Sequence, residues 1–287
     1  LDLPADVADQ DQFVAEHFDR WCYRTHDVFG RDLVRLQIVN GGAGRHWLLL
    51  STHHIVLDGM GGMNYLLKIL ACYEGLVNGT PTEMHDGYAA FIPENRNEMD
   101  QAATLAWWRQ RSLPVVPIDF SLPRTWQASN HYQILSQPLA RDVWNRAWEF
   151  CRRNKTHPSI FFRLLSALLL KQYCRPEGDF VLYDIQSGRK PGQESDIGVF
   201  YQQIPYIIDL QTLADDKSAK DFFVHQRDYR RAIRDYQQIS LSAQNRFMPA
   251  GRIAFQFNYF NFLRDVEVCG YRSFPYTFSS HVDNTVQ

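Results

Sequence analysis

The sequence predicts a mixed α/β (α+β) chain that folds as two lobes. Its 287 residues can hold one large domain or two lobes with an ample core. Strand-like and helix-like segments occur in both halves, which favours mixed sheets flanked by helices. A segment punctuated by Pro114, Pro117 and Pro123 separates the halves and is typical of an extended linker. We therefore assign residues 1–120 to an N-terminal lobe and residues 121–287 to a C-terminal lobe.

In the first half, apolar spacing and turn residues predict a β-hairpin with helices around it. A helix is expected at 10–23, where apolar side chains share one face. Residues 33–39 alternate as a strand does, and a glycine-rich turn leads to a second strand that ends at His54. The glycines after this strand are expected to break regular structure, so that the next helix occupies Met63 to Leu76. A further helix is expected at 98–111.

The second half repeats the mixture of strands and helices. Apolar periodicity and turn residues predict the following elements in order: a strand at 132–136, a helix at 142–154, a helix from Pro158 to Cys174, strands at 180–185 and 204–210, a helix at 218–236 and a strand at 253–259. The helix that Pro158 opens is strongly apolar. Its residues Leu164, Leu165, Leu168 and Leu169 are therefore expected in the core.

Composition excludes several classes of function. The net charge of -2 argues against a nucleic-acid-binding surface. The five cysteines are scattered without a CxxC pair, so a disulfide framework or a zinc site is not expected and a reducing cytoplasm fits best. The first ten residues lack the apolar core of a signal peptide, and the apolar stretch Ile160–Leu170 is too short to span a bilayer. We expect a monomeric cytoplasmic domain without a membrane anchor and, because no initiator methionine opens it, a fragment.

A histidine pair followed by an aspartate is the most informative motif. His53 and His54 end the apolar run that begins at Trp47, and Asp58 and Gly59 follow at a turn. The run lacks clean alternation, which predicts a strand buried on both faces. Because side chains alternate across a strand, the two imidazoles are expected to point to opposite sides. One ring can then face a cavity while the other braces the backbone.

Three other interpretations compete for this motif. A metal site is disfavoured, because adjacent histidines on a strand diverge and no second carboxylate or cysteine lies at ligand spacing. A nucleotide-binding loop is disfavoured, because the spacing of Gly59, Gly61 and Gly62 matches neither phosphate-binding fingerprint. A purely structural interpretation stays open: two core histidines, with Asp58 capping the next helix.

The order His53-His54-x-x-x-Asp58-Gly59 resembles the HHxxxDG signature of the condensation-domain superfamily. That superfamily includes the peptide-bond-forming domains of nonribosomal peptide synthetases, related acyltransferases and, more distantly, chloramphenicol acetyltransferase. Further segments resemble family motifs, namely Ala106–Gln110, Ser187-Gly188-Arg189, Ile197–Pro205, His225-Gln226 and Phe257-Asn258-Tyr259.

The resemblance covers about Phe29 to about Phe262, and the chain departs from it in places. Tyr201-Gln202-Gln203 stands where the family usually has Val-Asn-Thr. The family's opening helix and closing segments are not evident, so the domain is expected to be truncated at both ends. Epimerisation and heterocyclisation branches are disfavoured, because the former's extra block is missing and the latter replace the histidines.

The resemblance implies two chloramphenicol-acetyltransferase-like lobes that meet in a V-shaped pseudo-dimer around a substrate tunnel. In that arrangement His54 is catalytic at the middle of the tunnel, and the amide of Gly59 approaches the reacting carbonyl. Asp58 pairs with Arg189 behind the histidine, and His53 orients the loop. Asn258, Tyr201 and Gln202 are expected to line the tunnel.

The function so implied is an acyltransferase of the nonribosomal peptide synthetase type, which forms an amide or ester bond between a carrier-bound acyl or peptidyl thioester and an amine or hydroxyl acceptor. Carrier proteins and small-molecule substrates are the expected partners. Phosphopantetheine arrives on the carrier, and no metal or cofactor of the domain's own is expected. Two alternatives stay open: a stand-alone acyltransferase that uses a soluble thioester such as coenzyme A, and a catalytically degenerate carrier-docking or scaffold module.

One expected helix carries a cluster of arginines, namely Arg227, Arg230, Arg231 and Arg234. The interleaved Asp228 and Asp235 favour a solvated face. The alternative is a dock for an acidic carrier protein.

Overall fold

The computed structural model describes residues 1–4, 7–22, 24, 26–30, 32–80, 101–112, 115–116, 118, 137–247, 255–259, 266–268 and 271–273. Most of the proline-punctuated linker and the strand expected at 132–136 lie outside the described residues. The lobe boundary at residue 120 therefore stays a prediction. Among the described helices, none combines the length and the apolar character that crossing a membrane requires.

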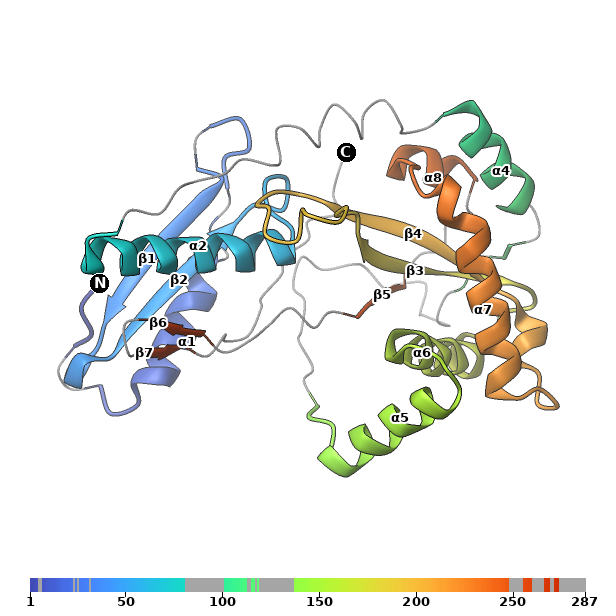
Figure 1. Cartoon of the computed structure of the whole chain (residues 1–287), viewed down its shortest axis with the longest axis horizontal. Helices are drawn as coiled ribbons and strands as arrows, with labels where there is room; N and C mark the ends of the chain where they lie inside the picture. Colours follow the sequence, from blue (N-terminus) through green and yellow to red (C-terminus); the bar gives the residue numbers. More distant parts are fainter. Residues whose placement is uncertain are drawn as a thin grey trace, which may run out of the picture.

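The first group of elements is a β-hairpin with a helix on either side of it along the chain (Figure 1). Helix α1 (Gln10–Cys22) precedes strand β1 (Val34–Asn40), a 3-10 turn η1 (Gly42–Gly44), strand β2 (His46–Thr52) and helix α2 (Gly59–Asn78). The strands pair antiparallel from Val34↔Thr52 to Asn40↔His46. The predicted helix and hairpin are confirmed.

The hairpin is buried less than expected. Val14 and Trp21 of α1 pack against Val39 and Leu49 to form a small core. In β2 only Leu49 and Ser51 are buried, and in β1 only Val39 is. The prediction of a strand buried on both faces is wrong for the described residues, because apolar side chains of this two-stranded ribbon pack mainly against one helix.

The second group of elements surrounds a three-stranded sheet of order β4-β3-β5. The central strand β3 (Phe180–Ser187) pairs antiparallel with β4 (Tyr201–Ile208) and parallel with β5 (Gln256–Asn258). The remaining elements are α4 (Ala102–Ser112), α5 (Arg141–Arg153), α6 (Pro158–Cys174), η2 (Leu210–Leu213), α7 (Ala219–Ile233), η3 (Arg234–Tyr236), α8 (Leu241–Phe247) and the short pair β6 (Val266–Val268) and β7 (Tyr271–Ser273).

Two apolar cores hold this sheet between helices (Figure 1). One core joins Phe180 and Leu182 to α6, η2 and α7. The other joins Val181 and Tyr206 to Trp108 of α4 and to α7 and α8. The strands and helices predicted at 142–154, 158–174, 180–185, 204–210 and 218–236 are thus confirmed, whereas α8, β6 and β7 were not predicted.

Two expectations about helices are corrected. Helix α2 begins at Gly59, four residues before the predicted start, because the Asp58 carboxylate caps it by accepting from the Gly61 amide at 2.6 Å. In α6 only Leu164 of the four leucines is buried, while Leu165, Leu168 and Leu169 are 40%, 40% and 55% exposed. The described neighbours of α6 cover one face of this helix, so an apolar side chain on another face is not a core residue.

Candidate active site

A buried ion pair joins the two groups of elements. Arg189, just after β3, donates from Nη1 to Asp58 Oδ2 at 2.8 Å and from Nη2 to Asp58 Oδ1 at 3.0 Å. Both side chains are 4% exposed. The guanidinium lies 4.2 Å from the centroid of the Phe200 ring. A two-bonded Arg–carboxylate pair of this kind fixes orientation as well as distance.

The Asp58 carboxylate also joins two backbone segments, the start of α2 and the segment that leads into β4. Oδ1 accepts from the amide of Gly61, and Oδ2 accepts from the amides of Phe200 and Tyr201 at 2.8 and 3.1 Å. The backbone amide of Asp58 donates to the carbonyl of Gly198 at 3.1 Å. The helix cap of the structural interpretation and the ion pair implied by the resemblance are therefore both present in one residue.

Close backbone packing makes this junction specific to glycine. A Cβ at Gly61 would lie 2.4 Å from the carbonyl oxygen of Gly198, and one at Gly188 would lie 2.3 Å from that of Phe200. No side chain fits at such distances without movement of backbone. The start of α2 and the segment before β4 are thus held in direct backbone contact.

The two histidines lie beyond the end of β2, in a turn. The sequence-based expectation placed them on the strand, but β2 ends at Thr52 and the turn closes with a bond from the Val56 amide to the His53 carbonyl. Strand alternation therefore does not set their directions. The hairpin still holds the first of them, because the His53 amide donates to the Leu33 carbonyl at 2.9 Å.

His53 is turned toward its own loop. Its Nδ1 accepts from the amide of Ile55 at 3.1 Å, and its ring meets that of His26 edge-on with centroids 6.1 Å apart. Burial, followed by the nearby charges of His26 and His54, lowers the pKa of His53. A neutral ring that accepts a backbone hydrogen bond is suited to shaping the loop.

His54, in contrast, is exposed. Its imidazole meets the ring of Tyr201 in an edge-to-face contact with centroids 5.5 Å apart and planes at 73°. Tyr201 is the first residue of β4, and its amide is one of those bound by Asp58. The exposed His54 ring is thus next to the buried junction, through its contact with Tyr201.

The other expected site residues occupy different positions. Gly59 is the first residue of α2, where a backbone amide has no partner within the helix. Tyr201 pairs with Ser187 in the sheet, and Asn258 pairs with Ile185, so register puts Tyr201 and Asn258 on one face. Gln202 points to the opposite face and donates to Gln238 Oε1 at 2.9 Å. Register therefore separates Gln202 from the other two.

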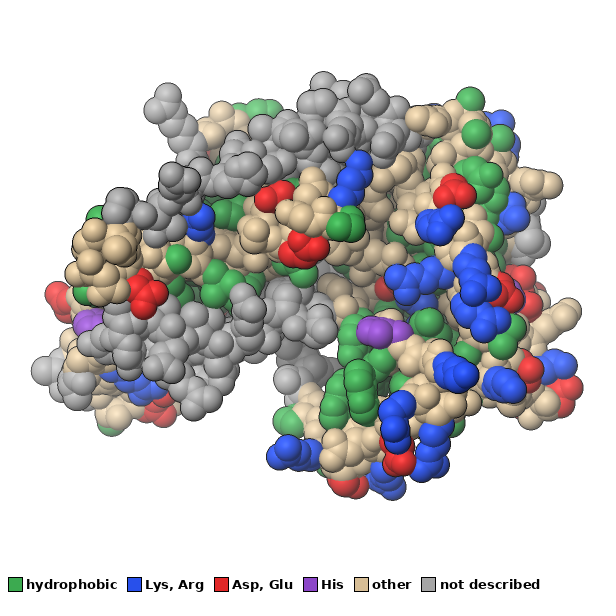
Figure 2. Space-filling view, viewed as in Figure 1, with side chains coloured by type: hydrophobic (Ala, Val, Ile, Leu, Met, Phe, Trp, Pro, Cys, Tyr) green, Lys and Arg blue, Asp and Glu red, His purple; other side chains and the backbone are tan. Residues whose placement is uncertain are grey.

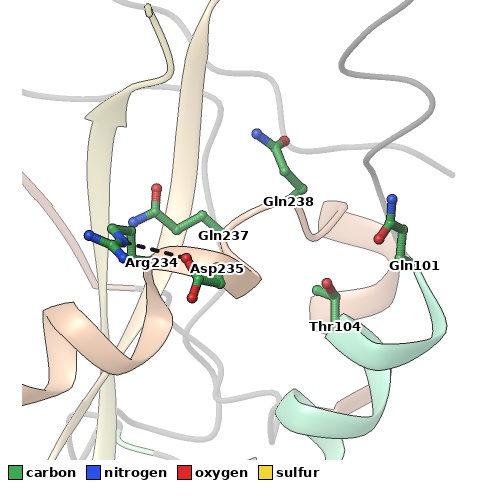
Figure 3. Close-up of a pocket in the computed structure, with 6 residues that line it drawn as sticks. All are labelled: Gln101, Thr104, Arg234, Asp235, Gln237 and Gln238. Atoms are coloured by element: carbon green, nitrogen blue, oxygen red, sulfur yellow. Dashed lines mark hydrogen bonds and ion pairs between the residues drawn. The ribbon is translucent and has the colours of Figure 1, made fainter.

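A polar pocket lies at the far end of that Gln202 contact (Figure 3). It has a volume of about 240 Å³. Its lining comes from α4 and the residue before it, from η3 and from the segment after η3, namely Gln101, Thr104, Arg234, Asp235, Gln237 and Gln238. Arg234 and Asp235 pair with each other at 3.4 Å, and both are largely exposed. Sequence reasoning did not find this pocket.

The arginines of α7 are exposed, and Figure 2 shows Lys and Arg side chains gathered over α7 and α5. Arg227 and Arg231 approach Asp228 at 3.3 and 3.6 Å. This geometry agrees with a solvated face.

A second buried ion pair lies between α6 and β3, which the sequence reasoning missed. Arg163 bonds Asp184, and their side chains are 4% and 5% exposed. Arg163 also lies 4.0 Å from the centroid of the Tyr206 ring, and Gln186 donates to Asp184 at 2.8 Å. Burial raises the pKa of Asp184, against the lowering effect of Arg163. The sequence signal that could have revealed this ion pair is a charged residue within each of two apolar runs.

Comparisons with known proteins agree with the motifs. A family model described as "Condensation domain" matches residues 4–259. Tyrocidine synthase 3 from Brevibacillus parabrevis is 24% identical over 210 residues, which is 69% of this chain and 3% of that protein. The chondramide synthase of Chondromyces crocatus is 27% identical over 196 residues, or 63% of this chain and 5% of the relative.

Solved condensation domains share the fold. The first condensation domain of the calcium-dependent antibiotic synthetase, in complex with a substrate analogue, superposes with a TM-score of 0.73 at 16% identity, over 94% of this chain and 61% of its own. The starter condensation domain of rhizomide synthetase gives 0.72 at 19% identity, over 94% and 62%. The chain thus spans a few per cent of the curated relatives and about three-fifths of the solved domains.

Proposed function

We propose, from the premise that this chain belongs to the condensation-domain family, that it is part of a domain that transfers an acyl or peptidyl group from a carrier-bound thioester to an amine or hydroxyl acceptor. One observation carries the proposal: an exposed His54 imidazole stands beside a fully buried Asp58–Arg189 pair. The fold similarity to condensation domains and the mixed α/β architecture support it.

The proposed reaction forms a C–N or C–O bond and breaks the thioester C–S bond. His54 accepts the proton of the attacking amine or hydroxyl, and the departing thiolate leaves as a thiol once it is protonated. The amide of Gly59 would donate to the oxyanion that develops on the carbonyl. Alignment of two tethered reactants can supply roughly 7–11 kcal/mol, whereas a general base contributes roughly 3–5 kcal/mol.

The remaining site residues are proposed to position these groups. Asp58 and Arg189 would hold the turn of the histidines against β4, and His53 would keep the loop in shape. Tyr201 and Asn258 share one face of the sheet and are proposed to line the substrate tunnel between the lobes. Gln202 would contribute only from the far side, through Gln238.

The proposed partners are carrier proteins of a nonribosomal peptide synthetase or a related polyketide assembly line, together with small acyl and acceptor substrates. Phosphopantetheine on the carrier would supply the thioester, and the domain itself would need no metal or cofactor. The proposed setting is secondary-metabolite biosynthesis in the cytoplasm, with the domain monomeric.

The test is mass spectrometry of loaded carrier proteins incubated with the full-length enzyme. Wild type is expected to produce the condensed product, and His54→Ala is expected to slow it. His46→Ala is a matched control, because His46 is an exposed histidine of β2 that bonds Asn40. Product from acyl-coenzyme A but not from the carrier would favour the stand-alone acyltransferase, and no product from either would favour a scaffold module.

The acceptor provides a second readout of His54. An amine is already a good nucleophile and depends mainly on alignment, while a hydroxyl depends more on the base. His54→Ala is therefore expected to slow transfer to a hydroxyl acceptor by about 10²-fold or more, and transfer to an amine less. Rates measured with matched amine and hydroxyl acceptors decide this, and an equal loss with both would contradict the assignment.

A further inference from the structure

We propose that Tyr201 sets the size of acceptor that can reach His54, so that this enzyme selects an acceptor with a small substituent on the carbon that bears its amine or hydroxyl. The inference rests on the proposed function and adds to it a specificity-determining residue and a substrate class. Three observations carry it, and they concern the ring contact, the backbone anchor and the residue type.

The first observation is the ring contact. The centroids of the Tyr201 and His54 rings are 5.5 Å apart, with the planes at 73°. A base must lie within about 2.6–3.2 Å of the atom whose proton it takes. The next atom of the acceptor lies only one covalent bond further from the imidazole. A substituent that extends from this atom toward β4 therefore approaches the Tyr201 ring.

The second observation is that the Tyr201 ring stands on a fixed backbone. The Tyr201 amide donates to Asp58 Oδ2 at 3.1 Å, and the same oxygen binds the Phe200 amide and the Arg189 guanidinium. Tyr201 also pairs with Ser187 at the end of β3. Tyr201 is half-buried, its backbone is anchored on both sides, and its ring has only two side-chain torsions. The Tyr201 ring therefore limits the space beside the His54 imidazole.

The third observation is the residue type. Position 201 holds a tyrosine, whose side chain is larger than that of an aliphatic residue such as valine. The tyrosine adds an aromatic ring and a hydroxyl to the space that a valine would leave open next to the imidazole. The difference is one of volume at a fixed place, and hydrophobic pockets discriminate mainly by volume.

The experiment measures kcat/KM for glycyl and leucyl acceptors with the full-length enzyme and one loaded donor. Tyr201→Val is expected to raise the leucyl-to-glycyl ratio on the order of 10-fold or more. Tyr201→Trp is expected to lower the ratio, which keeps the proposal testable if the valine variant does not fold. Tyr73→Val is the matched control, because Tyr73 is a half-exposed tyrosine of α2, and its ratio should equal that of wild type.

Two further arms separate the possible failures. Tyr201→Phe keeps the ring and is expected to keep the wild-type leucyl-to-glycyl ratio. A ratio that rises as much as in Tyr201→Val would assign the discrimination to the phenol hydroxyl and would overturn the proposal. A change of donor length at constant acceptor should leave the effect of Tyr201→Val unchanged. If the wild type turns over but no substitution at position 201 alters its leucyl-to-glycyl ratio, this inference alone is refuted. If the wild type does not turn over, the proposed function is refuted and the inference with it.

Discussion

Replacing Asp58 by alanine should destabilise the protein before it affects chemistry. The change leaves Arg189 as a charge that is 4% exposed and has lost its partner carboxylate, which costs about 3–5 kcal/mol. It also removes the cap of α2, worth about 1 kcal/mol. The expected loss is roughly 4–6 kcal/mol, a large part of the 5–15 kcal/mol that stabilises an ordinary domain. The amides of Phe200 and Tyr201, which also lose their acceptor, add to it.

The measurement is chemical or thermal unfolding of the full-length enzyme, followed with activity in parallel. At roughly 2–4 °C per kcal/mol, the transition of this domain should fall by about 10 °C or more. Asp142→Ala is the matched control, because its ion pair with Arg146 is exposed and should contribute under about 1 kcal/mol. The double variant Asp58→Ala/Arg189→Met should be more stable than Asp58→Ala, since it removes the stranded charge.

Two results would refute this reasoning. One is an Asp58→Ala protein that unfolds with wild-type stability but has no activity, which would assign the carboxylate to the chemistry. The other is a double variant that is less stable than the single one, which would mean that the contacts of Arg189 with the Phe200 ring and the Asp196 carbonyl outweigh the cost of its unpaired charge.

Three other predictions follow from the same geometry. Gly61→Ala should lose about 1–3 kcal/mol of stability, because its Cβ would lie 2.4 Å from a backbone oxygen. Gly62→Ala has open space for its Cβ and should gain up to about 1 kcal/mol. Denaturant midpoints of the two variants test this, and equal effects would argue against the close contact at Gly61. Arg163→Met should lose about 3–5 kcal/mol of stability, because it leaves Asp184 buried without its partner. Adding Asp184→Leu should restore part of that stability. An Arg163→Met protein as stable as wild type would contradict a buried pair. The pKa of His53 in the folded protein lies below its unfolded value of 6.5, so its contribution to stability is present above pH 6.5 and is lost as the pH falls below that value. His53→Gln should therefore flatten the acid side of a curve of unfolding free energy against pH. An unchanged slope would refute this.

Periodicity predicted the regular elements well where one side of the element is buried. The apolar helix from Pro158 to Cys174 was found with its observed bounds, and the helix predicted at 218–236 is α7 followed by η3. The turn of the hairpin was also correct, because three glycines leave few alternatives. These signals are local, so they need no knowledge of what the rest of the chain does.

The start of α2 was not predicted, because its cause is not local. Glycine is a poor helix former, so three glycines after Asp58 argued for a break. The helix begins there nevertheless, since Asp58 caps it and the carbonyl of Gly198 leaves no room for a side chain at Gly61. Small residues at this place serve a contact with a segment far away in the sequence.

Burial also depends on partners that periodicity does not reveal. Leu165, Leu168 and Leu169 follow a helical pattern of apolar residues, yet each is at least 40% exposed. Conversely, Arg163 and Asp184 are charged residues that the fold buries together. A pattern tells which residues share a face; it does not tell which element covers that face.

In the candidate site, the motif predicted the ion pair but not the neighbourhood of the histidine. The pairing of Asp58 with Arg189 came from the family resemblance and is present. The contact of His54 with Tyr201 depends on how β4 begins, which no short motif encodes. The catalytic roles of His54 and Gly59 stay predictions until turnover is measured.

The Asp58–Arg189 pair also has a consequence for the order of folding. Its partners are 131 residues apart along the chain, so forming it closes a long loop at a cost of roughly 4 kcal/mol in chain entropy. Contacts this distant are expected to form after the local hairpin and helices, on the native side of the folding barrier. Loss of the pair should therefore raise the unfolding rate far more than it lowers the refolding rate. The ion pair thus sets the lifetime of the folded domain.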